Sequence, residues 1–240
     1  PIIGLVLAGV VVATGTDIKR FKVGDQVYGL TGFGLGAYAA YKCMRETDSV
    51  FGCLAHKPNL VSYEEATMLA YGGLLAFRYM ERGQIKAGHQ VLIYGASGTT
   101  GTIAIQLAKY LGAKVTAVCS TSNVELVKSL GADTVIDYTK EDTLAPGTSY
   151  DFILDAVGKM KISKLKYACK KALAPGGKYV SIDDGRLLLD AKRLDQVSTL
   201  VDAGHVKPVM DRSFSFDEII EAHSYVEQGH KKGGVAVRID

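Results

Sequence analysis

A glycine-rich turn is the clearest chemical signal in this sequence. The turn reads Ala96-Ser97-Gly98-Thr99-Thr100-Gly101 and follows the apolar run Val91–Tyr94. Small residues permit a tight turn from strand to helix, a close approach of the backbone to a diphosphate, and tight packing of the helix on its strand. Free backbone N–H groups and the positive end of the helix dipole then face the phosphates. The turn therefore predicts a dinucleotide site; a turn that is tight for packing alone is the alternative.

The segments around this turn alternate between strand and helix patterns. Strand, helix and strand at this spacing indicate a parallel sheet with right-handed crossovers. The S-x-x-E pattern, which begins a helix with a capping box, occurs at Ser62 and at Ser122. We expect strands at 91–94, 114–119, 134–137, 151–155 and 178–182. We expect helices at 62–82, 99–112, 122–131, 163–173, 194–202 and 216–228.

The first 60 residues have a different texture, rich in glycine and in β-branched or aromatic residues. This composition predicts short antiparallel strands in a barrel-like β unit. Val10–Val12 are expected to form a buried strand that ends in a turn. Near the other end of the chain we expect extended structure at 206–210 and a closing strand at 235–239.

Composition excludes several classes of protein. The net charge of +3 is spread along 240 residues, so no basic patch for nucleic acid is expected. The apolar stretch Pro1–Ala13 is shorter than the roughly 20 residues of a membrane span and lacks a basic flank. Four cysteines without a C-x-x-C pair indicate buried, reduced thiols. We therefore expect a soluble, cytoplasmic protein that binds neither nucleic acid nor membrane.

Several blocks of sequence occur in an order that resembles a known superfamily. The blocks are Phe21–Val27, Gly36–Ala39, Gly95–Gly101, Leu130–Asp133, Leu173–Gly177, Val206–Val209 and Glu221–His223. Together they resemble the medium-chain dehydrogenase/reductase superfamily, in its zinc-independent quinone oxidoreductase-like branch. The resemblance implies an α/β fold in which a Rossmann domain, a doubly wound parallel sheet over residues 73–203, is inserted in a β-rich GroES-like catalytic domain. That second domain would comprise residues 1–72 and 204–240, with the active cleft between the two.

The sequence departs from this superfamily in two places. Relatives usually carry a longer segment before the position of Pro1 and a further segment after that of Gly185. The second segment includes the last strand of their Rossmann sheet, which often pairs two subunits. Half a pocket and a sheet edge are hard to lose without exposing apolar surface, so we expect a part of a longer protein. A homodimer through the Rossmann sheet edge is one possible assembly.

The metal ligands of the zinc-containing relatives are missing from the matching positions. Their Gly-His-Glu triplet is replaced by Gly4-Leu5-Val6, which offers no ligand. Cys43 and Cys53 have the wrong spacing for a closed site of four cysteines, and His56 is expected to be a surface residue. We therefore predict that the protein binds no metal.

The residues after the second expected strand favour NADP(H). An NAD-binding Rossmann unit places an acid about 20 residues after its glycines, to accept hydrogen bonds from the ribose 2′-hydroxyl. No acid lies between Gly101 and Val124, where Ser120 and Ser122 offer hydroxyls that can donate to a 2′-phosphate. Many relatives have a Lys or Arg near Ser122, which weakens this preference. The resemblance also implies a contact of Tyr138 with that phosphate, and it places the backbone of Ala156-Val157-Gly158 beside the nicotinamide ribose. A merely exposed Tyr138 is the alternative.

Without zinc to polarise a carbonyl, reduction of a conjugated system is the expected chemistry. We expect an NADPH-dependent enzyme that transfers hydride to a quinone or an α,β-unsaturated carbonyl compound, a small-molecule substrate. An enoyl-thioester reductase and a nucleotide-binding redox sensor or scaffold without efficient turnover are the alternatives. No catalytic acid is assigned: Tyr41 and Tyr71 are candidates, but core packing is the expected role of both.

Overall fold

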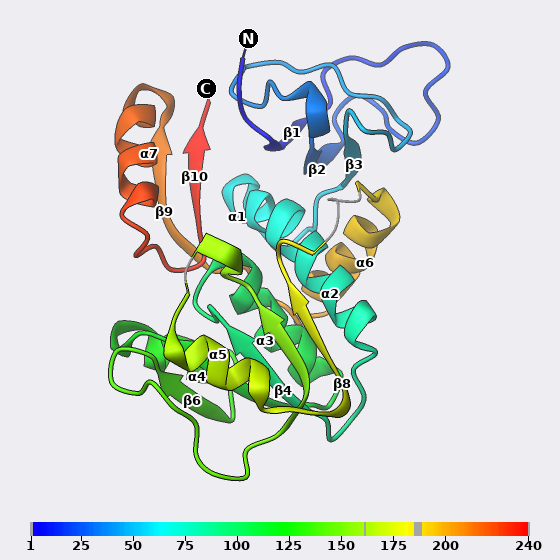
Figure 1. Cartoon of the computed structure of the whole chain (residues 1–240). Helices are drawn as coiled ribbons and strands as arrows, with labels where there is room; N and C mark the ends of the chain where they lie inside the picture. Colours follow the sequence, from blue (N-terminus) through cyan, green and yellow to red (C-terminus); the bar gives the residue numbers. More distant parts are fainter. Residues whose placement is uncertain (1, 161, 185–188, 240) are drawn as a thin grey trace. The chain divides into compact units, whose positions relative to one another are not determined.

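The computed structural model describes residues 2–160, 162–184 and 189–239, which fall into two compact units (Figure 1). The first unit is Pro1–Leu74 with Leu187–Asp240, and the second is Leu75–Arg186. The boundaries predicted from the sequence were 72/73 and 203/204. The helix over 191–202 therefore groups with the first unit, whereas the sequence assigned it to the Rossmann domain. The predicted shortening after Gly185 lies outside the described residues.

The second unit is built on a parallel sheet. Within its described residues the sheet has five strands in the order β6-β5-β4-β7-β8. They are β4 (Gln90–Tyr94), β5 (Lys114–Cys119), β6 (Thr134–Asp137), β7 (Tyr150–Asp155) and β8 (Leu173–Ser181). The chain runs outward from β4 to β6, then returns to the centre and runs the other way from β7 to β8, as in a Rossmann sheet. The predicted parallel sheet is confirmed, although β8 begins earlier than expected, at Leu173.

Helices cover both faces of this sheet (Figure 1). They are α2 (Leu74–Gly83), α3 (Thr99–Tyr110), α4 (Val124–Ser129) and α5 (Lys164–Lys171), with short helical turns η3 (Thr121–Asn123) and η4 (Gly158–Met160). On one face, Leu165 and Cys169 of α5 pack against Leu92 and Ile153. Helix α3 packs on β4 and β5 from the other face. A right-handed crossover changes face when the winding direction reverses, which accounts for this arrangement.

The first unit contains the antiparallel strands expected near the N-terminus. They are β1 (Val6–Val10), β2 (Gln26–Leu30) and β3 (Cys53–His56), paired in the order β1-β2-β3, with the turn η1 (Gly32–Gly34). The expectation of a buried strand at Val10–Val12 is wrong, because Val10 ends β1 and both Val10 and Val12 are exposed. Among the described residues, β1 pairs with β2 alone and lies at the edge of its sheet. The apolar residues at its end therefore stay exposed.

The C-terminal part of the first unit forms a separate parallel pair. Strands β9 (Met210–Ser215) and β10 (Gly234–Arg238) flank the turn η5 (Phe216–Glu218) and helix α7 (Ile219–Glu227). Extended structure was expected at 206–210, and within that stretch the ladder begins at its last residue, with the pair Met210 and Gly234. Residues before Met210 have no partner strand within the described chain.

The helix predicted to begin at Ser62 is interrupted. Helix α1 (Tyr63–Met68) starts with the predicted capping box: the Ser62 hydroxyl accepts from the Glu65 N–H, and the Glu65 carboxylate accepts from the Ser62 N–H. A π-helical turn (Leu69–Gly73) then joins α1 to α2. Such turns widen a helix locally, and periodicity over a short window does not distinguish them from an α-helix.

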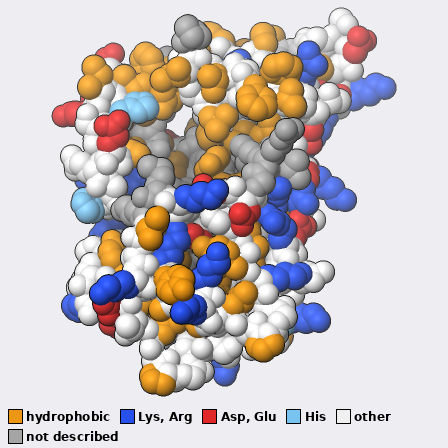
Figure 2. Space-filling view, in the orientation of Figure 1, with side chains coloured by type: hydrophobic (Ala, Val, Ile, Leu, Met, Phe, Trp, Pro, Cys, Tyr) orange, Lys and Arg blue, Asp and Glu red, His pale blue; other side chains and the backbone are white. Residues whose placement is uncertain are grey.

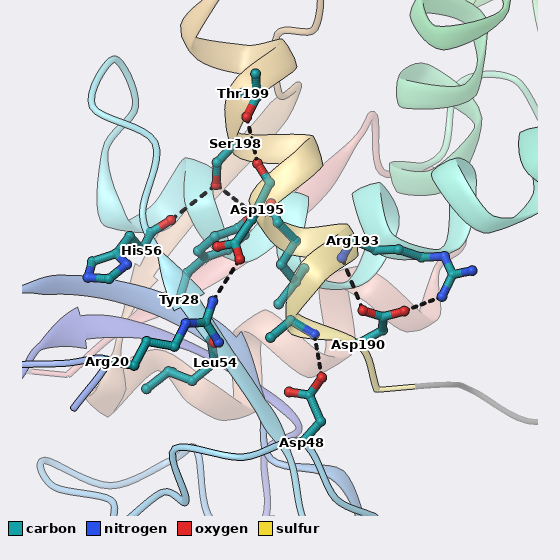
Figure 3. A network of polar contacts seen from close by, with 12 residues as sticks. Arg20, Tyr28, Asp48, Leu54, His56, Asp190, Arg193, Asp195, Ser198 and Thr199 are labelled. Carbon is teal, nitrogen blue, oxygen red and sulfur yellow. Dashed lines mark hydrogen bonds and ion pairs between the residues drawn. The ribbon is translucent and has the colours of Figure 1, made fainter. Parts of the chain in front are cut away.

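Polar contacts tie α6 (Ala191–Asp202) to the antiparallel sheet of the first unit (Figure 3). The Arg20 guanidinium pairs with Asp195 at 2.8 Å. The hydroxyl of the fully buried Tyr28 donates to the Leu194 carbonyl oxygen at 2.7 Å and accepts from Ser198 at 3.0 Å. Burial raises the pKa of Tyr28, so this phenol stays protonated and holds both contacts. These contacts join residues far apart in the sequence, which explains why α6 groups with the first unit.

Among the described residues, no helix is long and apolar enough to cross a membrane. Three of the four cysteines are buried, as expected, and Cys43 is exposed.

Candidate dinucleotide-binding site

The predicted binding residues meet at one edge of the parallel sheet in the second unit. Strands β4 and β7 are neighbours, and the chain leaves their carboxyl ends in opposite directions. Ligands of open α/β sheets bind at this kind of switch point. The predicted residues follow the strands there: Ala96, Ser97, Gly98, Thr99, Thr100 and Gly101 after β4, Ser120 and Ser122 after β5, Tyr138 after β6, and Ala156, Val157 and Gly158 after β7.

The structure explains the glycines in and next to the fingerprint turn in different ways. Gly95 has a φ of +81°, and a Cβ on it would lie 2.5 Å from a methyl group of Val157. A Cβ on Gly101 would lie 2.3 Å from the Gly95 carbonyl oxygen, so Gly101 permits close packing of α3 on β4. Gly98 differs, because its φ is −80° and the nearest atom to a Cβ would be 3.6 Å away. The protein itself does not require glycine at 98, which fits a surface left open for a ligand.

Backbone donors gather around this open surface. Among the described residues, the N–H groups of Ser97, Thr100 and Gly101 donate to no protein acceptor. Gly98 is the N-cap of α3, and the first turn of that helix holds no acidic residue. Unpaired N–H groups and the helix dipole favour an anion here. Ala96 is fully buried, so its role in any contact would be that of backbone.

The ends of β5 and β6 form a polar region rich in hydroxyl groups. The hydroxyls of Ser120 and Ser122 lie 3.2 Å apart. Asp137 ends β6 as an ionised acid, because hydrogen bonds from Thr121 and Thr139 lower its pKa to about 2. Tyr138 is exposed and its N–H donates to the Cys119 carbonyl oxygen at 3.1 Å, so the structure brings it to this edge. Whether its phenol contacts a phosphate stays a prediction.

Asn123 belongs to this region and was missed by the sequence analysis. The sequence assigned the capping of the following helix to Ser122, and that assignment is wrong. Helix α4 begins directly after Asn123, without a side-chain cap. The Asn123 amide nitrogen donates instead to the hydroxyls of Ser97 and Ser120, at 3.1 Å each. Its position, about 20 residues after Gly101, was the available signal, but only acids and hydroxyl groups were considered there.

The turn after β7 is held by a buried ion pair that the sequence did not reveal. Asp155 accepts from the N–H groups of Val157 and Gly158 at 3.1 Å each, through one carboxylate oxygen. Its other oxygen lies 2.6 Å from the Lys166 Nζ and accepts from the Tyr179 hydroxyl at 2.7 Å. The side chains of Lys166 and Asp155 are only 14% and 3% exposed. Lys166 also donates to the Gly158 carbonyl oxygen, so Asp155 and Lys166 both hold the 156–158 turn, and Tyr179 in turn holds Asp155.

The tyrosines considered as proton donors lie in the first unit and outside its core. Tyr41 is 77% exposed. Figure 2 shows hydrophobic side chains gathered on one face of the β1–β3 part of the chain. Tyr71, in the π-helical turn, is about 40% exposed, and burial of its phenol raises its pKa. The expectation of core packing is therefore wrong for both. Among the described residues, no cluster of His, Cys, Asp and Glu is arranged to hold a metal ion.

Comparison with known proteins agrees with the fold. Two family models described as "Zinc-binding dehydrogenase" match residues 99–185 and 185–237. The chain is 34% identical to 2-methylene-furan-3-one reductase of Solanum lycopersicum, over 98% of the chain and 62% of that protein. It is also 34% identical to quinone-oxidoreductase QR1, chloroplastic, of Triphysaria versicolor, over 96% of the chain and 78% of that protein. The chain belongs to the medium-chain dehydrogenase/reductase superfamily.

Within this superfamily, the relatives' names place the chain in the quinone oxidoreductase-like branch, as the sequence predicted. The structure resembles an alcohol dehydrogenase superfamily protein of Novosphingobium aromaticivorans, with a TM-score of 0.82 and 28% identity over 99% of this chain and 82% of that one. The Rossmann and GroES-like architecture of medium-chain dehydrogenases is thereby confirmed. The chain spans 62% of the length of the Solanum relative.

Proposed function

We propose that the protein is an NADPH-dependent oxidoreductase that reduces quinones or α,β-unsaturated carbonyl compounds without zinc. The observation that carries this proposal is the open surface at Gly98, surrounded by unpaired N–H groups at the switch point of the sheet. Backbone donors at the start of α3 fit a diphosphate, because they supply hydrogen bonds and a positive dipole end without a side chain in the way.

Two further groups of residues fit the remaining parts of a dinucleotide. Ser120, Ser122, Asn123 and Tyr138 would surround the adenosine ribose with groups that can donate hydrogen bonds to a 2′-phosphate. The ionised Asp137 stands behind Thr121 and opposes a phosphate, so we expect NADPH to be preferred to NADH by a modest factor.

The turn of Ala156, Val157 and Gly158 would border the nicotinamide ribose. Its backbone is held by Asp155 and Lys166, so the turn is preorganised and its orientation costs little when ligand binds. When bound, the reduced nicotinamide supplies a hydride, and the chain's task is to orient the reactants and exclude water.

The names of the relatives support the substrate class. A 2-methylene-furan-3-one has a carbon–carbon double bond conjugated with a ketone, and a quinone is also a conjugated dicarbonyl. Both accept hydride at a conjugated position. The fingerprint alone does not establish an activity, because a dinucleotide site is compatible with many reactions.

Fluorescence titration with NADPH, followed by turnover assays, tests the proposal. We expect NADPH to bind and to be oxidised by a simple quinone or an alkenal. Faster oxidation by a crotonyl thioester would favour an enoyl-thioester reductase, and tight binding without any turnover would favour a sensor or scaffold. Absence of NADPH binding would contradict the proposal, and equal affinity for NADH would contradict the preference for the 2′-phosphate.

Zinc independence, compartment and assembly are separate parts of the proposal. We expect quinone reduction to be unchanged after dialysis against a chelator, because the Gly4-Leu5-Val6 triplet offers no ligand.

The cysteine pattern supports a cytoplasmic setting, although the Triphysaria relative is named chloroplastic. Cell fractionation decides between the two compartments. Strand β8 ends the described sheet, and light scattering tests whether its edge pairs two copies.

A further inference from the structure

The segment 156–178, which contains α5, differs in charge from the rest of the chain. It holds seven lysines and no aspartate or glutamate, whereas the whole chain has 28 basic and 25 acidic residues. The even spread of charge expected from composition therefore does not hold in this segment. A run of like charges without counter-charges favours contact with an anionic partner.

Three of these lysines lie on the outer face of α5. Leu165 and Cys169 pack into the core of the second unit, and Tyr167, between them in sequence, lies on the opposite side of the helix. Tyr167 is 63% exposed, and Ile162, just before the N-cap Ser163, is 92% exposed. Figure 2 shows basic and hydrophobic side chains next to each other over this helix. We call the exposed residues Ile162, Lys164, Tyr167, Lys170 and Lys171 the α5 surface.

The packing of the second unit does not account for the lysines of the α5 surface. None of the three forms an ion pair with another described residue, whereas Lys128 of α4 pairs with Glu125. The negative end of the helix dipole favours cations in the last turn, which explains Lys170 and Lys171. Lys164 is the first residue of α5, where the dipole opposes a cation. The described chain therefore leaves this basic face without an ion-pair partner.

We propose that the α5 surface binds the anionic headgroups of a lipid bilayer. Each lysine close to such a membrane strengthens binding about fivefold. A tyrosine favours the boundary between headgroups and hydrocarbon, and an exposed isoleucine gains by leaving water there. A nucleic acid or an acidic peptide also attracts lysines. The bilayer in addition offers an apolar layer directly beneath its charges, which suits Ile162 and Tyr167.

This contact is peripheral, because the apolar side of α5 stays packed in the core of the second unit. It differs from the expectation of no membrane binding, which rested on the charge of the whole chain and on the lack of a spanning segment. It does not depend on the proposed reaction.

Co-sedimentation with lipid vesicles tests the proposal on the full chain. Vesicles of equal parts phosphatidylcholine and phosphatidylserine should bind the wild-type protein, and vesicles of phosphatidylcholine alone should bind it much less. Lys164→Ala combined with Lys171→Ala should weaken binding to the anionic vesicles roughly 25-fold, at about fivefold per lysine. Lys86→Ala combined with Lys114→Ala is the matched control, since it removes two exposed lysines outside the α5 surface and should leave binding nearly unchanged.

Two results of this assay would refute the proposal. One is wild-type binding by a folded α5 double variant, or equal weakening by both pairs of substitutions. The other is a wild-type protein that does not bind the anionic vesicles, and binding of a single-stranded RNA in that case would identify nucleic acid as the partner instead.

A fluorescence measurement leaves all the lysines in place. The chain has no tryptophan, so Tyr167→Trp introduces a single reporter at the centre of the α5 surface. Its emission should shift to shorter wavelength when anionic vesicles are added, because the ring leaves water. Tyr110→Trp is the control and should not shift, since Tyr110 is exposed at the end of α3, on the other face of the sheet. An unshifted emission of the Tyr167→Trp variant would overturn the inference.

Discussion

Substitution of Gly98 is expected to weaken coenzyme binding without disturbing the fold. A Cβ at Gly98 would meet its nearest atom, the Gly95 carbonyl oxygen, at 3.6 Å, which is ordinary contact. A Cβ at Gly101 would lie 2.3 Å from the same oxygen and 2.8 Å from the backbone of Ala96. Gly98→Val should therefore spare the fold, whereas Gly101→Val should force the backbone of α3 away from β4.

The expected loss of affinity follows from the N–H groups around Gly98. A valine there would hold the diphosphate away from the N–H groups of Ser97, Thr100 and Gly101. Hydrogen bonds to charged groups contribute roughly 1.5–3 kcal/mol each, so losing two of them costs roughly 3–6 kcal/mol. This corresponds to a Kd for NADPH that is on the order of 100- to 10,000-fold higher.

The expected change in stability is much smaller for Gly98→Val than for Gly101→Val. Valine is a poorer N-cap than glycine by about 1 kcal/mol, which lowers the Tm by roughly 2–4 °C in a chain of this size. The backbone displacement at Gly101 should cost about 3 kcal/mol or more.

NADPH fluorescence titration and thermal unfolding of the same samples measure both quantities. Gly9→Val is the matched control, since Gly9 lies in β1 of the first unit and a Cβ there would meet no atom within 4 Å. The control should bind NADPH like the wild type. Wild-type affinity in a folded Gly98→Val variant would show that the diphosphate does not bind at this turn.

Three further predictions concern the groups that hold the site and the thiols. Lys166→Met removes the cation that pairs with the buried Asp155 carboxylate, so it should lower the free energy of unfolding in urea by about 3–5 kcal/mol. The variant should also have a higher KM for NADPH. A denaturation midpoint equal to that of the wild type would contradict this. Thr121→Val should raise the pKa of Asp137 from about 2 towards its ordinary 3.8, as measured by NMR titration. Because folding lowers this pKa, the carboxylate's contribution to stability is present above about pH 4 and is lost as the pH falls towards 2. The variant should lose part of that contribution. An unchanged titration curve would show that the Thr121 hydrogen bond does not cause the lowered pKa of Asp137. In the native protein only Cys43 should react with a disulfide reagent at neutral pH, because burial raises the thiol pKa of the other three, and Cys43→Ser should abolish the fast reaction; rapid labelling of that variant would contradict this. Those three are Cys53, with a pKa raised to about 11, Cys119, also about 11, and Cys169, about 12.

The sequence predicted the second unit better than the first. Its strands are continuous apolar runs separated by helices with recognisable ends, and such patterns depend on neighbouring residues. The capping box at Ser62 was predicted correctly for the same reason. In the first unit, the burial of Val10 and Val12 depended on which strands pair beside β1, and no local pattern carries that information.

The candidate site was predicted in part. The fingerprint turn, Ser120 and the 156–158 turn come to one edge of the sheet, because the carboxyl ends of parallel strands meet there. The partners that hold them were missed. Lys166 pairs with Asp155 across the crossover between β7 and β8, and Asn123 reaches Ser97 from the neighbouring crossover.

The sequence by itself determined that this chain contains a Rossmann unit with a glycine-rich turn between β4 and α3, because glycine spacing and apolar periodicity act over a few residues. Only the tertiary structure decided which side chains serve that turn. Asn123 does not cap α4 with its side chain and instead contacts Ser97 and Ser120. Helix α6 contacts Tyr28 and Arg20 of the first unit. These hydrogen bonds and ion pairs link segments far apart in the chain, so they form only once the chain has folded.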